Sequence, residues 1–191
     1  MHMKRNLTAG RARRVAFLGL MFALAMVLSV LEWMLPVLPG LPPGIKLGLS
    51  NIVTMYALFF LGISDSFLLA VLKSLFVFLT RGAVAGLLSG AGGLLSVCVM
   101  LVGIKLSRHT IPYTLISVCG GIFHNLGQLL MVALLMGSTI ALYYLPVMLL
   151  SGFGMGLVTG ILLRTLLPHL KRLEQSVCRG QGKPRSQERK L

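Results

Sequence analysis

Polar residues that could bind a ligand stand at the start of one apolar stretch of this chain. Lys46, Ser50 and Thr54 follow one another at intervals of four residues, directly after the proline-rich turn at 35–43, and Asn51 lies beside them. Residues at this spacing share one face of a helix. Polar groups in hydrocarbon are costly and usually face a protein interior or a water-filled cavity. This face is therefore a candidate ligand site.

Charged residues interrupt the other apolar stretches as well. Lys73 lies near the middle of one stretch and Arg81 lies eight residues further on, so the two share a helix face. Glu32 lies near the end of the first stretch, where it could pair with a cation. Lys46 and Arg81 could instead extend their charged ends to the membrane interface. The mid-stretch position of Lys73 favours a cavity or a buried partner.

Uncharged polar side chains complete the predicted site. Ser96 follows a Gly-Gly pair, and His124 and Gln128 share a helix face near the middle of a later stretch, although His124 could also be a hydrogen-bonded packing residue. We expect an outward-facing pocket of net positive charge, suited to an anionic or strongly hydrogen-bonding small molecule. Its predicted lining residues are Glu32, Lys46, Ser50, Asn51, Lys73, Arg81, Ser96, His124, Asn125 and Gln128.

The sequence does not favour catalysis or a metal site. The four acidic residues, Glu32, Asp65, Glu174 and Glu188, are scattered along the chain, whereas diphosphate transfer needs clustered carboxylates that hold magnesium. No phosphate-binding loop, nucleophile elbow or zinc-protease motif is present. His124 has no second His or Cys at ligand spacing. We therefore expect a protein without a catalytic residue, a metal or a resident cofactor.

The composition is that of an integral membrane protein. Hydrophobic residues make up 56% of the chain and charged residues only 12%, against roughly 25% charged residues in soluble domains. The net charge of +14 is concentrated before Val15 and from Arg164 onward. This pattern orients both ends of a membrane protein toward the cytoplasm and attracts anionic lipid headgroups. Without a nucleic-acid-binding module, it does not favour nucleic acid as a partner. The three cysteines predict no disulfide framework.

Apolar stretches of about 20 residues predict an all-α bundle of six transmembrane helices in a cell membrane. A basic segment at 1–14 precedes the transmembrane domain at 15–166, and a basic, disordered tail follows at 167–191. An even number of spans keeps both basic ends on one side. The first stretch lacks a cleavage site and is therefore a span rather than a signal peptide. The predicted helices are Val15–Leu35, Ile45–Leu61, Phe67–Leu79, Ala83–Ile104, Tyr113–Met136 and Ile140–Leu166, with a tight turn at 62–66.

Small residues recur at intervals of four, which permits close contact between helices in lipid. One row is Gly82, Gly86 and Gly90, and another is Gly152, Gly156 and Gly160. These rows favour packing within the bundle. The first span carries weaker rows, which could instead dock a separate membrane protein: Ala12, Ala16, Gly19 and Ala23.

Three motifs also resemble those of a known family. They are residues 44–52 (Gly-Ile-Lys-Leu-Gly-Leu-Ser-Asn-Ile), 92–96 (Gly-Gly-Leu-Leu-Ser) and 124–128 (His-Asn-Leu-Gly-Gln). Together they resemble the Gx transporter family, many of whose members are labelled heptaprenyl diphosphate synthase component I. The resemblance runs from about Arg14 to Leu166. Lys73 stands where the family more often has Arg, which keeps the charge but not the bidentate geometry.

The resemblance implies more than one function. The family is similar to the substrate-binding subunits of energy-coupling-factor transporters, which implies an outward-facing pocket and docking of a transmembrane coupling protein with its ATPase subunits. It also implies a vitamin-, flavin- or isoprenoid-related ligand. The family label implies instead an accessory, non-catalytic role beside a prenyl synthase in heptaprenyl diphosphate or menaquinone synthesis. A third reading is a membrane scaffold for a flavoprotein in a redox system.

Overall fold

The computed structural model spans the chain and describes residues 2–34, 49–107, 112–136 and 138–179. Within these ranges the secondary structure is helical and contains no strand, which confirms the predicted all-α class. The helices are α1 (His2–Met34), α2 (Asn51–Phe60), α3 (Ile63–Arg81), α4 (Ala83–Ser107), α5 (Tyr113–Met136) and α6 (Ser138–Arg179).

Five of these helices are long and apolar enough to cross a membrane. The spanning segments lie in α1, α3, α4, α5 and α6, whereas the ten residues of α2 are fewer than the roughly 20 that a span needs. Residues 45–48, which we predicted as the start of this helix, lie outside the described residues. The chain is thus a multi-pass membrane protein, and a sixth span stays a prediction.

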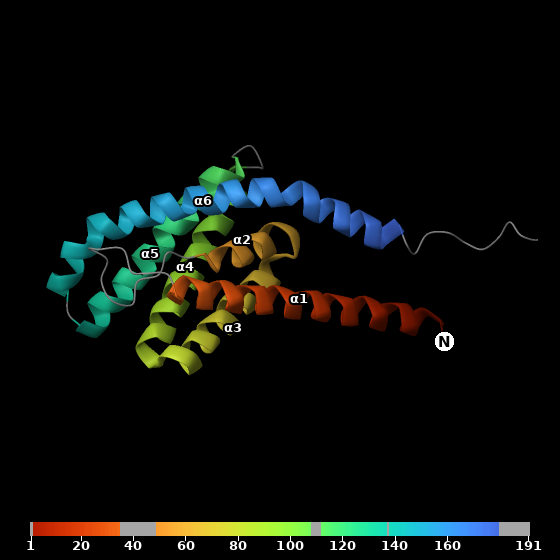
Figure 1. The fold of residues 1–191 in the computed structure, drawn as a ribbon, viewed down its shortest axis with the longest axis horizontal. Helices are drawn as coiled ribbons and strands as arrows, with labels where there is room; N and C mark the ends of the chain where they lie inside the picture. The colour runs from red at the N-terminus through yellow and green to blue at the C-terminus, as the bar shows by residue number, and fades with distance from the viewer. Residues whose placement is uncertain (1, 35–48, 108–111, 137, 180–191) are drawn as a thin grey trace, which may run out of the picture.

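The helices pack mainly against their neighbours in the chain. α4 lies between α3 and α5, α5 packs along α6, and α2 contacts α3, α4 and α6 (Figure 1). α1 packs on α2 and α3 at the edge of this arrangement. The N-terminal end of α1 and the C-terminal end of α6 both extend beyond the bundle at the same end of the molecule (Figure 1).

Apolar side chains fill the space between the helices. The central cluster includes Met55 of α2, Val97 and Met100 of α4, and Leu163 of α6. A second cluster joins α1 to α2 and α3. Large apolar side chains such as Leu134 also stay exposed on the outside of the bundle, as expected of helices that face lipid.

Glycines let α5 approach its neighbours at backbone distance. A Cβ added to Gly121 of α5 would lie 2.4 Å from the carbonyl oxygen of Gly152, and one added to Gly156 would lie 2.5 Å from the Cα of Val118. Gly86 meets Phe78 of α3 in the same way, at 2.5 Å. Apart from Gly82, whose added Cβ would meet nothing within 4 Å, the glycines of the two predicted rows pack against neighbouring helices, as predicted.

The start of α3 differs from the prediction. We expected a turn over 62–66, but α3 begins at Ile63, and of these five residues only Gly62, at a φ of 122°, lies outside the helix. The polar residues Ser64, Asp65 and Ser66 that suggested a turn form the first turn of the helix instead. Ser and Asp are favoured at helix starts, and a carboxylate there interacts favourably with the helix dipole.

The ends of two other helices also lie beyond the predicted limits. α4 continues to Ser107 rather than ending at Ile104, and α6 runs from Ser138 to Arg179 rather than ending at Leu166. α6 therefore extends into the segment 167–191 that we predicted as the tail. Hydropathy marks the end of the apolar segment, whereas the helix continues through polar residues that are themselves good helix formers.

Candidate functional site

Charged side chains meet between the C-terminal halves of α1 and α3. Glu32 of α1 and Lys73 of α3 are buried, with 6% and 2% of their surfaces exposed. The Glu32 carboxylate is close enough to interact electrostatically with both Lys73 and Arg81. The Nη2 atom of Arg81 also donates a hydrogen bond of 2.6 Å to the backbone oxygen of Ser29. The structure thus brings these predicted site residues together.

The charges of this cluster do not balance. Two cations, Lys73 and Arg81, share the carboxylate of Glu32. A buried charge is stabilised only by a close partner of opposite sign and by hydrogen bonds. These three residues therefore carry a net positive charge, which favours an anion nearby.

A chain of hydrogen bonds links α2, α4 and α5. The Nδ2 atom of Asn51 donates to the Oγ of Ser96 over 3.3 Å, and the Ser96 hydroxyl donates to the carbonyl oxygen of Gly120 over 2.8 Å. Because Ser96 donates its hydroxyl hydrogen to Gly120, its oxygen must accept the hydrogen bond from Asn51. This fixes the orientation of the Asn51 amide. The Asn51 Oδ1 atom is buried and has no hydrogen-bond partner among the residues that the structure describes.

His124 and Gln128 lie one turn apart on α5, against α4. Their side-chain nitrogens are 3.1 Å apart. Gly92 of α4 leaves the space for them, since a Cβ there would lie 2.6 Å from the His124 carbonyl oxygen and 2.9 Å from the Cγ of Gln128. The Oε1 atom of Gln128 is buried and, like Asn51 Oδ1, has no hydrogen-bond partner within the described part of the chain. An N–H or O–H donor of a ligand would satisfy such an acceptor.

Asn125 points toward a different helix. Its Nδ2 atom donates to the Met148 carbonyl oxygen at 2.9 Å and to the Ser151 Oγ at 2.8 Å, both on α6. Successive residues are about 100° apart around a helix, so Asn125 cannot share the direction of His124 and Gln128. Asn125 therefore joins α5 to α6.

The charged cluster and the His124–Gln128 pair lie at a similar level of the bundle. Gly90 of α4 contacts Ser74, the residue after Lys73, and Gly92 contacts His124. The positions on α4 that face the two groups are thus two residues apart, a rise of about 3 Å along the helix axis. The predicted site residues on α3 and α5 consequently flank the same part of α4.

The remaining predicted residues are two candidate site residues and the predicted docking row of α1. Ser50 is buried at the start of α2, and Lys46 lies outside the described residues. In the predicted docking row, Ala16 and Gly19 are exposed and Ala23 is half-buried. A Cβ at Gly19 would meet nothing within 4 Å, so this part of α1 faces away from the bundle. The side chain of Ala12 is outside the described part.

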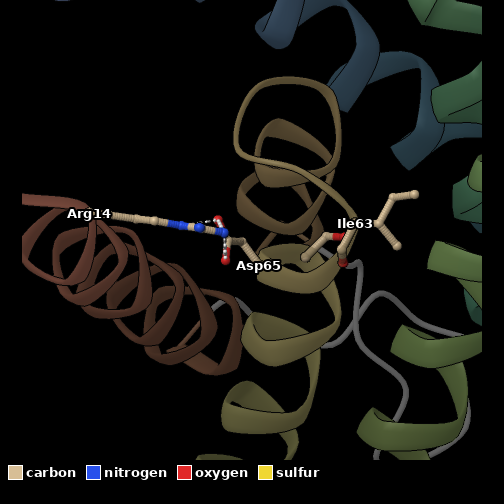
Figure 2. A network of polar contacts seen from close by, with 4 residues as sticks. Arg14, Ile63 and Asp65 are labelled. Carbon is tan, nitrogen blue, oxygen red and sulfur yellow. Dashed lines mark hydrogen bonds and ion pairs between the residues drawn. The ribbon is translucent and has the colours of Figure 1, made fainter. Parts of the chain in front are cut away.

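Sequence reasoning missed an ion pair between α1 and α3. Arg14 contacts Asp65 with two nitrogens, at 2.7 Å from Nη2 to Oδ1 and 3.0 Å from Nε to Oδ2 (Figure 2). Asp65 is buried, and its neighbour Ser66 donates a hydrogen bond of 2.7 Å to the Ile63 carbonyl oxygen. The two partners are 51 residues apart, so no local spacing links them. The available signal was that Asp65 is the one acidic residue besides Glu32 that precedes Glu174 in the sequence.

Metal-binding side chains do not gather in the described part of the chain. No group of three or more His, Cys, Asp or Glu residues there could hold a metal ion. Cys98 is exposed and Cys119 is half-buried, and both are free thiols. The polar groups of the bundle interior are therefore a cationic cluster and amide, hydroxyl and imidazole groups.

A bundle with five membrane-length helices and buried charges defines a multi-pass membrane protein. Residues 21–166 match the family described as heptaprenyl diphosphate synthase component I, and the chain belongs to that family. This match confirms the family label that the three sequence motifs indicated. The comparison with curated proteins and the comparison with solved structures gave no match.

Proposed function

We propose that this protein binds a small anionic molecule within its helix bundle and takes part in its uptake across the cell membrane, without catalysing a reaction. The observation that supports this most is the cluster in which the buried Lys73 and the half-buried Arg81 both interact with the buried Glu32. A helix that only had to sit in lipid would gain nothing from burying Lys73, because desolvation of a charge is costly.

The rest of the bundle interior fits a ligand that also forms hydrogen bonds. The buried acceptors Asn51 Oδ1 and Gln128 Oε1 would pair with N–H or O–H groups of such a molecule. A vitamin- or flavin-related molecule with an anionic group carries both kinds of group. Since the sequence contains no nucleotide-binding motif, energy for uptake would come from an ion gradient or from a coupling protein with ATPase subunits that docks on the exposed small-residue face of α1.

The basic ends support one orientation of the protein. Lys and Arg residues are concentrated at the start of α1 and toward the end of α6, and these ends extend from the same side of the bundle (Figure 1). The excess of Lys and Arg near span ends marks the cytoplasmic side. In this orientation Glu32 and Arg81 lie toward the outer face, where a substrate would enter.

Replacing Lys73 by Met tests the proposal. The protein would be extracted from its native membrane in mild detergent and examined by native mass spectrometry. We expect a small bound molecule that is lost in Lys73→Met and kept in Lys105→Met, which removes the same charge from an exposed position near the end of α4. A ligand retained by Lys73→Met would exclude Lys73 from the site.

The family description favours a second function. A heptaprenyl diphosphate synthase component I would act as a membrane partner of a catalytic synthase component. The four scattered acidic residues of this chain cannot form the carboxylate cluster that prenyl transfer needs, so catalysis would belong to the partner. This function predicts that deleting the gene shortens or depletes the quinone tail, which mass spectrometry of membrane lipids would detect. Normal quinone in the deletion strain would count against it.

A further inference from the structure

Glu32 carries the same sign of charge as the proposed ligand, yet it lies within the anion-attracting cluster. Glu32 is buried, with 6% of its surface exposed, and it interacts with both Lys73 and Arg81. Two roles are possible for such a carboxylate. It could bind a donor group of the ligand, or it could occupy the cations while the ligand is absent.

The attachment of α1 favours the second role. Glu32 lies three residues after Ser29, whose carbonyl oxygen accepts the hydrogen bond from Arg81 at 2.6 Å, so the C-terminal end of α1 is held on α3 by polar contacts. Apolar packing involves the middle of α1, where Met21 and Ala25 are buried. In the N-terminal half of α1, Arg14 pairs with Asp65 at the start of α3 (Figure 2). One end of α1 therefore depends on the same cations that would bind a ligand.

We propose that Glu32 is an internal competitor of the ligand: its carboxylate occupies Lys73 and Arg81 until an anionic group displaces it and releases the C-terminal end of α1 from α3. The proposal rests on the anion-binding function proposed above. It explains why a carboxylate is buried at an anion site. Without Glu32, the buried Lys73 of the empty protein would lose the carboxylate that interacts with it, which is strongly destabilising in a bundle interior.

The charge balance determines how selective such a site would be. Exchange of one anion for another keeps an anionic group beside Lys73 and Arg81 in both states, whereas a neutral molecule would have to separate the cations from Glu32 without replacing its charge. Binding would thus require a negative charge on the ligand. Its apparent affinity would be lowered because part of the binding free energy is used to displace Glu32.

Inorganic diphosphate can serve as the probe, because it supplies a small anion without any other recognition group. Its affinity would be measured by isothermal titration calorimetry with the full chain in nanodiscs of zwitterionic lipid. For Glu32→Gln we expect binding about tenfold tighter than for the wild type, the size of effect that removal of one competing charge can give in a partly screened interior. Glu174→Gln removes the same charge from the C-terminal part of α6 and should leave the affinity unchanged.

If Glu32→Gln binds diphosphate no more tightly than the wild type, the competitor role is wrong. The anion site would still be supported if the wild type binds diphosphate and Lys73→Met does not. Absence of diphosphate binding by both the wild type and Glu32→Gln would overturn the anion site and the competitor together. Unfolding of each variant would be followed in the same nanodiscs to confirm that it is folded.

A second measurement does not depend on substituting Glu32. Spin labels would be attached at Val30→Cys and Leu79→Cys, which are exposed positions near the facing ends of α1 and α3, after the three native cysteines are replaced by Ser. The distance between the labels should increase when diphosphate is added and should not change in Lys73→Met. An unchanged distance in a protein that binds diphosphate would overturn the displacement of α1.

Discussion

Gly92 offers a sharp test of the contact between α4 and α5 at the candidate site. A Cβ at this position would lie 2.6 Å from the His124 carbonyl oxygen, 2.9 Å from the Cγ of Gln128 and 3.1 Å from the Cε1 of His124. The nearest of these atoms belongs to the backbone and cannot move by a change of rotamer. In Gly92→Ala, α5 must therefore move away from α4, together with His124 and Gln128.

The expected cost follows from these distances. An ordinary van der Waals contact begins at 3.4 Å, so the shortest contact is too close by about 0.8 Å. Overpacking of this kind costs typically about 1–3 kcal/mol, and the better helix propensity of Ala offsets up to about 1 kcal/mol. We expect Gly92→Ala to lower the free energy of unfolding by about 1–2 kcal/mol and to weaken ligand binding, because Gln128 is displaced.

The adjacent glycine provides the control. A Cβ at Gly93 would meet only the Cβ of Ala70, at 3.8 Å, so Gly93→Ala should be neutral or slightly stabilising. Both variants would be unfolded with SDS in mixed micelles, and the loss of structure would be followed by circular dichroism and by the fluorescence of the single Trp. Equal unfolding free energies for the two variants would show that the contact between Gly92 and α5 is not as close as described.

Two further pairs of variants test the packing of α6 and of α1. Gly156→Ala should destabilise by about 1–3 kcal/mol, because its Cβ would lie 2.5 Å from the Cα of Val118, whereas Gly154→Ala has open space and should be tolerated; similar SDS unfolding curves would contradict this. Arg14→Gln leaves the buried Asp65 carboxylate without its bidentate partner, and a double-mutant cycle with Asp65→Asn should give a coupling of about 1 kcal/mol, since Arg14 is 59% exposed. A coupling near zero would mean that the pair does not hold α1 on α3.

Helical spacing predicted which residues share a face, but not which other helix that face contacts. The interval of eight residues placed Lys73 and Arg81 on one side of α3, and both do interact with Glu32. Sequence alone suggested a partner for Glu32 without identifying α3 as the helix that α1 packs on. That choice depends on the packing of side chains from distant segments, which no local pattern contains.

The same argument separates Asn125 from its neighbours. We grouped it with His124 and Gln128 because the three lie within five consecutive residues. The 100° rotation between adjacent helical residues already implies a different direction for Asn125, and in the structure it bonds to α6. Adjacency in sequence was thus a poorer guide than angular position.

Boundaries were the least predictable feature of the fold. The polar run at 64–66 begins α3 rather than preceding it, and α6 continues past its apolar segment to Arg179. In both cases hydropathy reported the position of the membrane-compatible residues and not the extent of the helix. Helix formation depends on propensity and capping. Ser and Asp are unfavourable inside a helix, but at its start they can cap it and stabilise it.

α1 connects the candidate anion site with the exposed small-residue face proposed for docking a membrane partner. Its C-terminal part carries Glu32, which interacts with the cations of the candidate site, whereas its N-terminal half presents Ala16 and Gly19 away from the bundle. If an anion displaces Glu32, the helix pivots about the Arg14–Asp65 pair, and the exposed small-residue face changes its inclination. A membrane partner that packs on this face would then distinguish the occupied protein from the empty one, because close helix contacts at small residues tolerate little change in crossing angle. The ligand and the partner would in this way be coupled through one rigid helix, and each would alter the affinity for the other by the same factor.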